Sequence, residues 1–282
     1  MLFFRSLLLA LLLCLFAPVV FAGGSAQWIT SSSQLLGGPG AVGQIGDVLI
    51  SNGEISIVIS AINHPHGYAN TGGNVVDAAR TENLYDSFGQ LYTYLDDDWP
   101  RQANYTSLII VNDGSGTNPA RVRAQGTDSG NSSISIVTDY ILSEGASEIT
   151  IISTLSNNSA TDLSGFELGD AFEWSSNETF APGYGFDISG TTYQSWIAGA
   201  TGFQAYGYFS HGEMMWGPNG NGWSDVNILS ADIHSGDQMQ YTRYFHVGNG
   251  GVASVASSAH ALAGLQTGTL TGTVTRDDNG AA

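Results

Sequence analysis

The chain of 282 residues carries seven basic and 25 acidic residues, giving a formal net charge of −18, and it contains no lysine. This balance argues against nucleic acids and anionic membrane surfaces as partners, because binding to either depends on basic patches. Hydrophobic residues make up 42% of the chain and aromatic residues 11%. Such a composition can bury a core, which argues against disorder.

The N-terminus has the order of a signal peptide. Arg5 precedes an apolar run over residues 7–21, and the small residue Ala22 follows. At about 15 residues the run is shorter than the roughly 20 that span a bilayer as a helix. We therefore predict that residues 1–22 are cleaved and that the protein is secreted or periplasmic. The only cysteine, Cys14, would leave with this segment, and a mature chain without disulfides favours a bacterial source.

The clearest strand signal covers residues 46–60, where two apolar runs flank Asn52-Gly53. This dipeptide favours the positive φ angles of a type I′ turn, so the segment is predicted to form an antiparallel hairpin. Ile55, Ile57 and Ile59 alternate with other residues, which predicts that one face of the second strand is buried.

Further short apolar runs predict more strands, and no helical periodicity separates them. They cover residues 107–112, 120–126, 133–142, 148–155, 204–209, 239–247 and 270–276, with turns at Asp113-Gly114, Glu144-Gly145 and Asn279-Gly280. Only residues 255–265 have a weak helical pattern. We predict an all-β fold, a large antiparallel β-sandwich over residues 23–266 with few or no helices.

Several segments, read in order, resemble a known sandwich region. They are residues 46–60, 71–78, 104–116, 138–157, 166–172 and 181–185. The resemblance is to the N-terminal β-sandwich of secreted bacterial proteins that carry a metallohydrolase domain of the CehA/McbA type, in the PHP superfamily. It implies a supersandwich similar to that of galactose mutarotase, serving a hydrolase as an accessory module. The Asp-x-His-x-His segment of the hydrolase is absent from this sequence.

Residues 267–282 resemble the opening of a carboxypeptidase-regulatory-like domain, with a Gly-x-Val strand pattern followed by a polar glycine turn. The resemblance implies the start of a second, truncated domain. The alternative is that residues 270–276 form the closing edge strand of the main sandwich.

Two kinds of metal-site candidate have simpler explanations. His64 and His66 are spaced to share a metal ion if the chain is extended, but no clear third ligand accompanies them, and their loop also suits a long turn. The acidic runs over residues 96–98 and 277–279 lack the full spacing of a calcium loop and are predicted to be solvated turns. We predict no metal site.

The candidate binding residues are aromatic side chains in the Gly-, Asn- and Ser-rich stretch 174–225. Rings carried on loops there could stack on sugar faces, or they could pack beneath a long loop. Glu167, Asp170 and Glu173 could supply paired carboxylates, but a strand would turn Asp170 away from the other two. The candidate ligand-binding residues are Trp174, Tyr184, Trp196, Trp216, Trp223 and Asp170.

The leading hypothesis is a non-catalytic accessory module of an exported bacterial protein. It would recognise glycan or pack against a downstream metallohydrolase domain, so its partner is carbohydrate or that domain of the same polypeptide. We predict no catalytic residue and no cofactor, since nucleotide-binding and serine-hydrolase motifs are absent from the sequence. The acidic balance predicts no nucleic-acid partner, and the short apolar run, with no second one after it, predicts no membrane insertion. The alternatives are a carbohydrate-active enzyme of mutarotase-like fold and a structural or adhesive surface protein.

Overall fold

The computed structural model describes residues 23–266, 268 and 271–272. The predicted signal peptide, most of the predicted strand 270–276 and the acidic turn 277–279 lie outside the described residues. Within the described part of the chain, no helix is both long enough and apolar enough to span a membrane.

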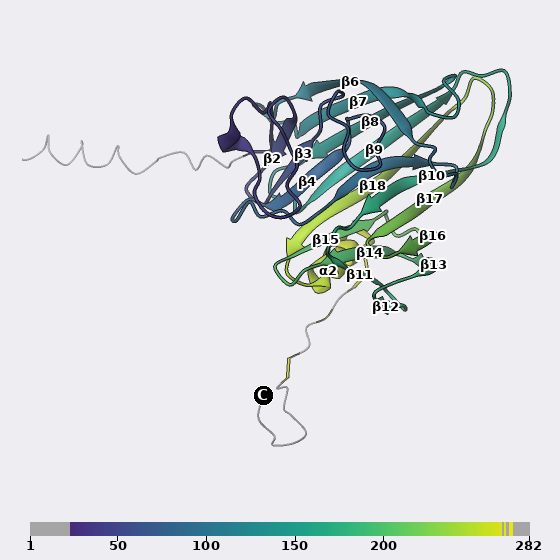
Figure 1. Ribbon diagram of the computed structural model, residues 1–282. Helices are drawn as coiled ribbons and strands as arrows, with labels where there is room; N and C mark the ends of the chain where they lie inside the picture. Colours follow the sequence, from purple (N-terminus) through teal and green to yellow (C-terminus); the bar gives the residue numbers. More distant parts are fainter. Residues whose placement is uncertain (1–22, 267, 269–270, 273–282) are drawn as a thin grey trace, which may run out of the picture.

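Two antiparallel nine-stranded sheets form the body of the protein (Figure 1). The first sheet has the order β1 (Ser25–Trp28), β2 (Val48–Ser51), β3 (Ile55–Ile59), β4 (Val75–Arg80), β5 (Gln90–Leu95), β10 (Leu163–Glu173), β17 (Trp223–Ile233), β16 (Met215–Gly220), β13 (Gly190–Gln194). The second has the order β12 (Gly185–Phe186), β11 (Glu178–Ala181), β14 (Trp196–Ala200), β15 (Gln204–Phe209), β18 (Gln238–Asn249), β9 (Glu148–Asn157), β8 (Ile134–Leu142), β7 (Ala120–Asp128), β6 (Ala103–Asn112). The predicted all-β sandwich is confirmed.

The main core lies between the two sheets and comes from the period-two pattern of their strands. In β9 every second residue is buried, so Ile149, Ile151 and Leu155 face inward. They belong to the same buried cluster as Leu91 of the first sheet and Phe245 of the second. Alternation of this kind is typical of strands with one face on a core and the other toward solvent.

The β2–β3 hairpin forms as predicted, but its turn differs. Neither Asn52 nor Gly53 has a positive φ, so the type I′ prediction is wrong. The Asn52 side chain instead accepts hydrogen bonds from the backbone of residues 54 and 55, and its amide donates to the carbonyls of Ser143 and Ala146. These hydrogen bonds connect the β2–β3 turn to the turn between β8 and β9, about 90 residues away. They hold the β2–β3 turn in a conformation other than type I′.

Burial of β3 also differs from the prediction of one buried face, since every residue of this strand is buried. The three isoleucines face the main core, while Val58 joins a second cluster with Ile29, Leu36, Leu49, Val76 and Ala79. The segment that connects β1 to β2, including the 3-10 helix Ser32–Gln34, covers this outer face.

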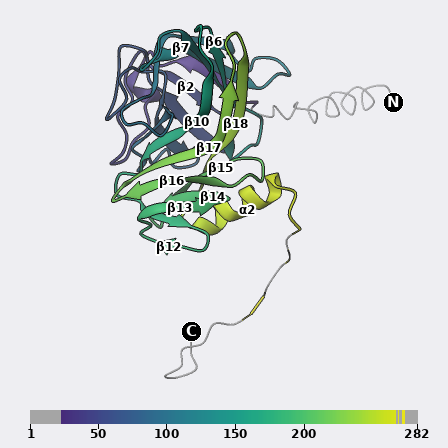
Figure 2. The same ribbon diagram turned by 90° about the vertical axis from the view of Figure 1, so that its right-hand side faces the viewer.

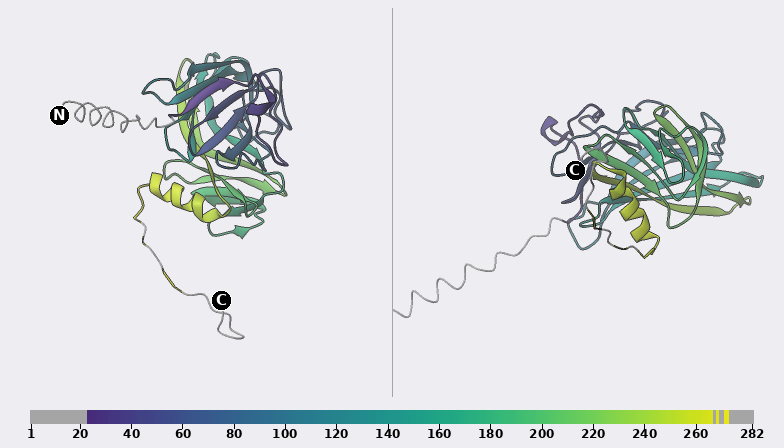
Figure 3. Two further views of the ribbon diagram at one scale, coloured as in Figure 1. Left: turned by 90° about the vertical axis from the view of Figure 1, so that its left-hand side faces the viewer. Right: turned by 90° about the horizontal axis from the view of Figure 1, so that it is seen from below.

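The α-helix α2 (Val252–Leu262) follows β18, close to the weak helical pattern at 255–265. It packs on β14, β15 and β18, as Figures 2 and 3 show from several sides. A Cβ added to Gly207 of β15 would lie 2.2 Å from Val255 Cγ1. The close approach of helix and sheet therefore requires a glycine at position 207.

The stretch 174–225 is not a long loop. It forms β11 to β16 and the start of β17, which extend both sheets at one end. Apart from β15, which the run over residues 204–209 predicted, these strands are short and contain several glycines, a residue depleted in strands, so their intrinsic signal is weak. Pairing with the long strands β17 and β18 fixes them.

Candidate functional site

The candidate site lies on the face of the first sheet turned away from the core, over β5, β10 and β17. Ala171 of β10 pairs with Tyr92 on one side and with Asp225 on the other. Paired residues project from the same face of a sheet, so the three side chains form one row. Ala171 itself is buried in a small cluster with Ala69, Tyr92 and Tyr94.

A hollow of about 330 Å³ lies against this row and is lined by Tyr68, Tyr92, Trp99, Phe172, Trp223 and Asp225. The ring of Phe172 itself packs in the main core. Tyr92 is buried at its base, whereas Tyr68, Trp99 and Trp223 are 58%, 53% and 40% exposed. Tyr68 and Trp99 meet edge to face, with ring centroids 5.5 Å apart. We call this site the aromatic hollow. It offers exposed ring faces around one carboxyl group.

The carboxyl group of Asp225 has an unusual protonation equilibrium. Burial, reinforced by the negative charge of Asp97, raises the pKa of Asp225 to about 7. At neutral pH this group therefore exists in comparable amounts as an acid that donates a hydrogen bond and as a carboxylate that only accepts.

Gln102 braces the two loops that carry the exposed rings. Its buried side chain donates to the carbonyl of Tyr68 (3.1 Å) and to that of Pro100 (3.2 Å), and accepts from the backbone N–H of Asn70 (2.8 Å). Tyr68 lies on the loop before β4, and Trp99 lies on the β5–β6 loop next to Pro100. The brace therefore holds one wall of the aromatic hollow in place.

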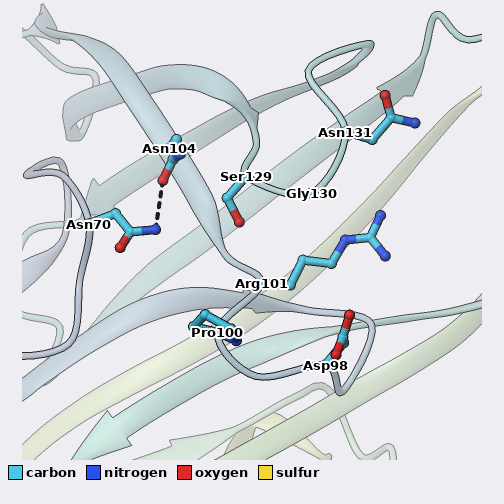
Figure 4. Close-up of a pocket in the computed structure, with 8 residues that line it drawn as sticks. All are labelled: Asn70, Asp98, Pro100, Arg101, Asn104, Ser129, Gly130 and Asn131. Atoms are coloured by element: carbon cyan, nitrogen blue, oxygen red, sulfur yellow. Dashed lines mark hydrogen bonds between the residues drawn. The ribbon is translucent and has the colours of Figure 1, made fainter.

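A second, polar hollow adjoins the same loops (Figure 4). Its volume is about 710 Å³, and it is lined by Asn70, Asp98, Pro100, Arg101, Asn104, Ser129, Gly130 and Asn131. The Asn70 amide donates to Asn104 Oδ1 at 3.2 Å across one end. We call this site the polar hollow.

The structure separates the six candidate ligand-binding residues. Trp174 is fully buried in the main core, and Trp196 is buried beneath α2, so neither ring has a face open to a ligand. Trp223 lines the aromatic hollow. Trp216 pairs with Asn227 of β17 and lies half-buried on the same outer face of the first sheet. Tyr184 is exposed, and its hydroxyl accepts a hydrogen bond from the backbone N–H of Tyr193.

Asp170 belongs to the interior and not to a ligand site. Both of its carboxylate oxygens accept from the guanidinium of Arg243, at 2.6 and 2.8 Å, and both side chains are fully buried. The hydroxyl of Tyr208 donates to the same carboxylate at 2.5 Å. Because β10 and β18 belong to different sheets, this pair ties the two layers together. Glu167 and Glu173 lie on the opposite face of β10, as the strand alternation predicts.

Two of the metal-site candidates, His64 and Asp96, have protein partners. His64 lies in the loop that connects β3 and β4, and its Nδ1 is 2.7 Å from Oδ1 of Asp47, the residue before β2. Asp96 pairs with the guanidinium of Arg101 at 2.5 Å. Among the residues that the structure describes, no group of three or more His, Cys, Asp or Glu side chains is placed to hold a metal ion.

Sequence reasoning missed Tyr68, Tyr92, Trp99 and Asp225. A signal for Tyr92 exists, because in the segment QLYTYL tyrosines alternate with Leu91, Thr93 and Leu95, which predicts a strand with tyrosines on one face. The sequence carries no comparable signal for Tyr68 or Trp99, which lie on loops brought to the sheet by tertiary contacts.

Comparison with known proteins shows a similarity of fold. No protein-family profile and no curated protein sequence matches the chain. Among solved structures, a TPR-domain containing protein from Parabacteroides distasonis aligns with a TM-score of 0.52 at 9% identity, over 83% of this chain and 50% of that one. A GH36 alpha-galactosidase from Geobacillus stearothermophilus aligns at 0.50 and 10% identity, over 77% and 42%.

An alpha-mannosidase from Enterococcus faecalis V583 aligns with a TM-score of 0.52 at 9% identity, over 76% of this chain and 31% of that one. The chain thus spans half or less of the length of these three proteins. At such low identity the similarity is one of architecture, a β-sandwich that also occurs within glycoside hydrolases.

Proposed function

We propose that this chain is a carbohydrate-binding β-sandwich module of an exported bacterial protein, with the aromatic hollow as its sugar site. The observation that carries the proposal is the arrangement of three exposed rings, Tyr68, Trp99 and Trp223, around the carboxyl group of Asp225. The C–H faces of a sugar pack on aromatic rings, and a carboxyl group hydrogen-bonds its hydroxyls. The volume of the hollow falls at the lower end of the range for small-molecule sites.

The acidic balance of the chain and its fold support the same proposal. Neutral sugars are compatible with a strongly negative protein, whereas anionic polymers are repelled. Sandwiches of similar architecture occur in an alpha-galactosidase and an alpha-mannosidase. We further propose that residues 1–22 direct export, that a carboxypeptidase-regulatory-like domain begins directly after the sandwich at residue 267, and that the module serves a CehA/McbA-type metallohydrolase domain of the same polypeptide.

A glycan array followed by calorimetry tests the sugar site. Trp223→Ala should weaken binding of the array ligand by about 1–3 kcal/mol, by analogy with base stacking on aromatic side chains. Trp28→Ala is the matched control, because Trp28 is 42% exposed but lies on β1, outside the hollow. Equal affinities of the two variants, or an array on which no glycan binds, would refute the proposal.

A second candidate function is catalysis on a sugar, favoured by the carboxyl groups on this face. Glu173 pairs with Trp223, so Glu173 and Asp225 are diagonal neighbours on β10 and β17, a relation in which residues lie roughly 7–8 Å apart and their Cβ atoms somewhat closer. A carboxyl group with a pKa of about 7 suits general acid–base work at neutral pH. Assays for epimerase, lyase and hydrolase turnover decide this, since Asp225→Asn should abolish any activity that depends on the pair.

A further inference from the structure

We infer that the polar hollow is a second sugar subsite, continuous with the aromatic hollow over the ridge formed by Tyr68–Asn70 and Asp98–Arg101, so that the ligand is an oligosaccharide. The inference rests on the proposed function, because it assigns the length of the ligand that occupies the same site. It goes beyond that function by adding binding residues from the β6 strand and the β7–β8 turn.

The first argument is that the two hollows share their dividing wall. On one chain segment Tyr68 lines the aromatic hollow and Asn70 lines the polar hollow. On the other segment Trp99 lines the aromatic hollow and Pro100 lines the polar hollow. Tyr68 and Asn70 are two residues apart, so their Cα atoms are separated by at most about 7 Å. The ridge is therefore one chain segment thick at this point, and a ligand that fills one hollow extends readily into the other.

The second argument is the chemistry of the polar hollow. The side chains of Asn70, Asn104 and Asn131 carry amides, and Ser129 carries a hydroxyl. Amides and hydroxyls both donate and accept hydrogen bonds, as sugar hydroxyls do. Figure 4 shows Asn70, Asn104 and Ser129 around a common space, on three separate chain segments, with the Asn131 amide pointing away from them.

The third argument concerns charge, which excludes an anionic ligand. Among the described residues that line the polar hollow, Arg101 is the one cation, and its guanidinium is bound by Asp128 at 2.6 Å and by Asp96 at 2.5 Å. Asp98 lines the same hollow. Carboxylates therefore outnumber the single positive charge, and a phosphate or sulfate group would be repelled. A neutral, hydroxyl-rich ligand fits the remaining groups.

The fourth argument is that the ridge is fixed before any ligand binds. Two contacts add to the brace made by Gln102. The Arg101 guanidinium lies 4.7 Å from the ring centroid of Phe166. Asp128, which binds Arg101, also accepts a hydrogen bond from the N–H of Gly130 at 2.8 Å. These contacts join the β5–β6 loop to the first sheet and to the β7–β8 turn. A preformed wall lowers the cost of ordering on binding.

The experiment measures affinity against ligand length by calorimetry. The starting probes are galactose, melibiose, raffinose and stachyose, together with mannose, mannobiose and mannotriose, because the similar structures include an alpha-galactosidase in complex with stachyose and an alpha-mannosidase. If the array selects another glycan, that glycan and its shortened fragments replace this set. We expect the affinity to rise about tenfold or more from one to three sugar units, as two or three added hydrogen bonds would give.

Asn104→Ala identifies where the added units bind. The substitution should weaken binding of the longest probe about three- to tenfold and leave the affinity for the monosaccharide unchanged. Thr106→Ala is the control, because Thr106 is exposed on the same strand but does not line the hollow. Thermal unfolding of both variants verifies that they are folded.

Failure of the proposed function and failure of this inference give different experimental results. An array on which no glycan binds refutes the proposed function and this inference with it. Binding that does not depend on ligand length refutes the inference and leaves the sugar site intact. A length dependence that survives Asn104→Ala but is lost in Trp216→Ala would place the added units on the other side of the aromatic hollow, and would likewise overturn the inference.

Discussion

Asp86 is a buried carboxyl group between β4 and β5 whose replacement should change how stability depends on pH. Its Oδ1 accepts from the N–H groups of Ala78 (3.1 Å) and Phe88 (3.0 Å) and from the hydroxyl of Tyr206 (3.2 Å). Its Oδ2 is buried and has no hydrogen-bond partner among the residues that the structure describes. Asp86→Asn keeps the accepting oxygen and replaces Oδ2 with a neutral group, so it mimics the protonated side chain.

The size of the effect follows from the shift in proton affinity. Burial, together with the negative charge of nearby Asp77, raises the pKa of Asp86 from 3.8 to about 8. Between these two values the folded state holds one proton more than the unfolded state. The free energy of unfolding therefore falls as pH rises, by about 1.4 kcal/mol per pH unit. From pH 5 to pH 7 this group alone would remove about 3 kcal/mol of stability.

Urea unfolding at pH 5, 6 and 7 measures this slope. The wild-type protein should lose about 3 kcal/mol more than Asp86→Asn over this range, and other titrating groups cancel in the comparison. Asp237→Asn, at an exposed position, controls for the loss of one negative charge and should keep the wild-type slope. If wild type and Asp86→Asn have the same slope, Asp86 is not neutral in the folded protein and the reasoning fails.

Three further predictions concern the interior and the site. Asp170→Asn should cost about 3–5 kcal/mol in urea unfolding, because it leaves Arg243 charged and buried without its partner; a cost below 1 kcal/mol would contradict this. Gly207→Ala should destabilise by about 1–3 kcal/mol through overpacking against α2, whereas Gly116→Ala, where an added Cβ has no neighbour within 4 Å, should have little effect. Sugar affinity should increase severalfold from pH 6 to pH 8 as Asp225 ionises, because a carboxylate is the stronger acceptor; calorimetry should show that Asp225→Asn removes this dependence.

Local patterns predicted much of the sandwich. The strands β6 to β9, β15 and β18 lie close to the predicted runs. In β6 to β9 and β18 the reason is that a strand with one buried face alternates apolar and polar residues, and this alternation is present in the sequence itself. β15 is buried on both faces, and its short run of apolar residues predicted it. The same alternation correctly predicted that Asp170 projects away from Glu167 and Glu173. The all-β class therefore needed no knowledge of which strands pair.

The sequence did not determine which aromatic residues remain accessible. Trp174, Trp196 and Trp223 lie within one stretch of similar composition, yet the first two are buried and the third is 40% exposed. The difference arises from segments distant in the chain, such as α2, which covers Trp196. Tyr68 and Trp99 join Trp223 only because two loops cross the outer face of the first sheet. Exposure of a ring depends on what covers it, which is a property of tertiary packing and not of local sequence.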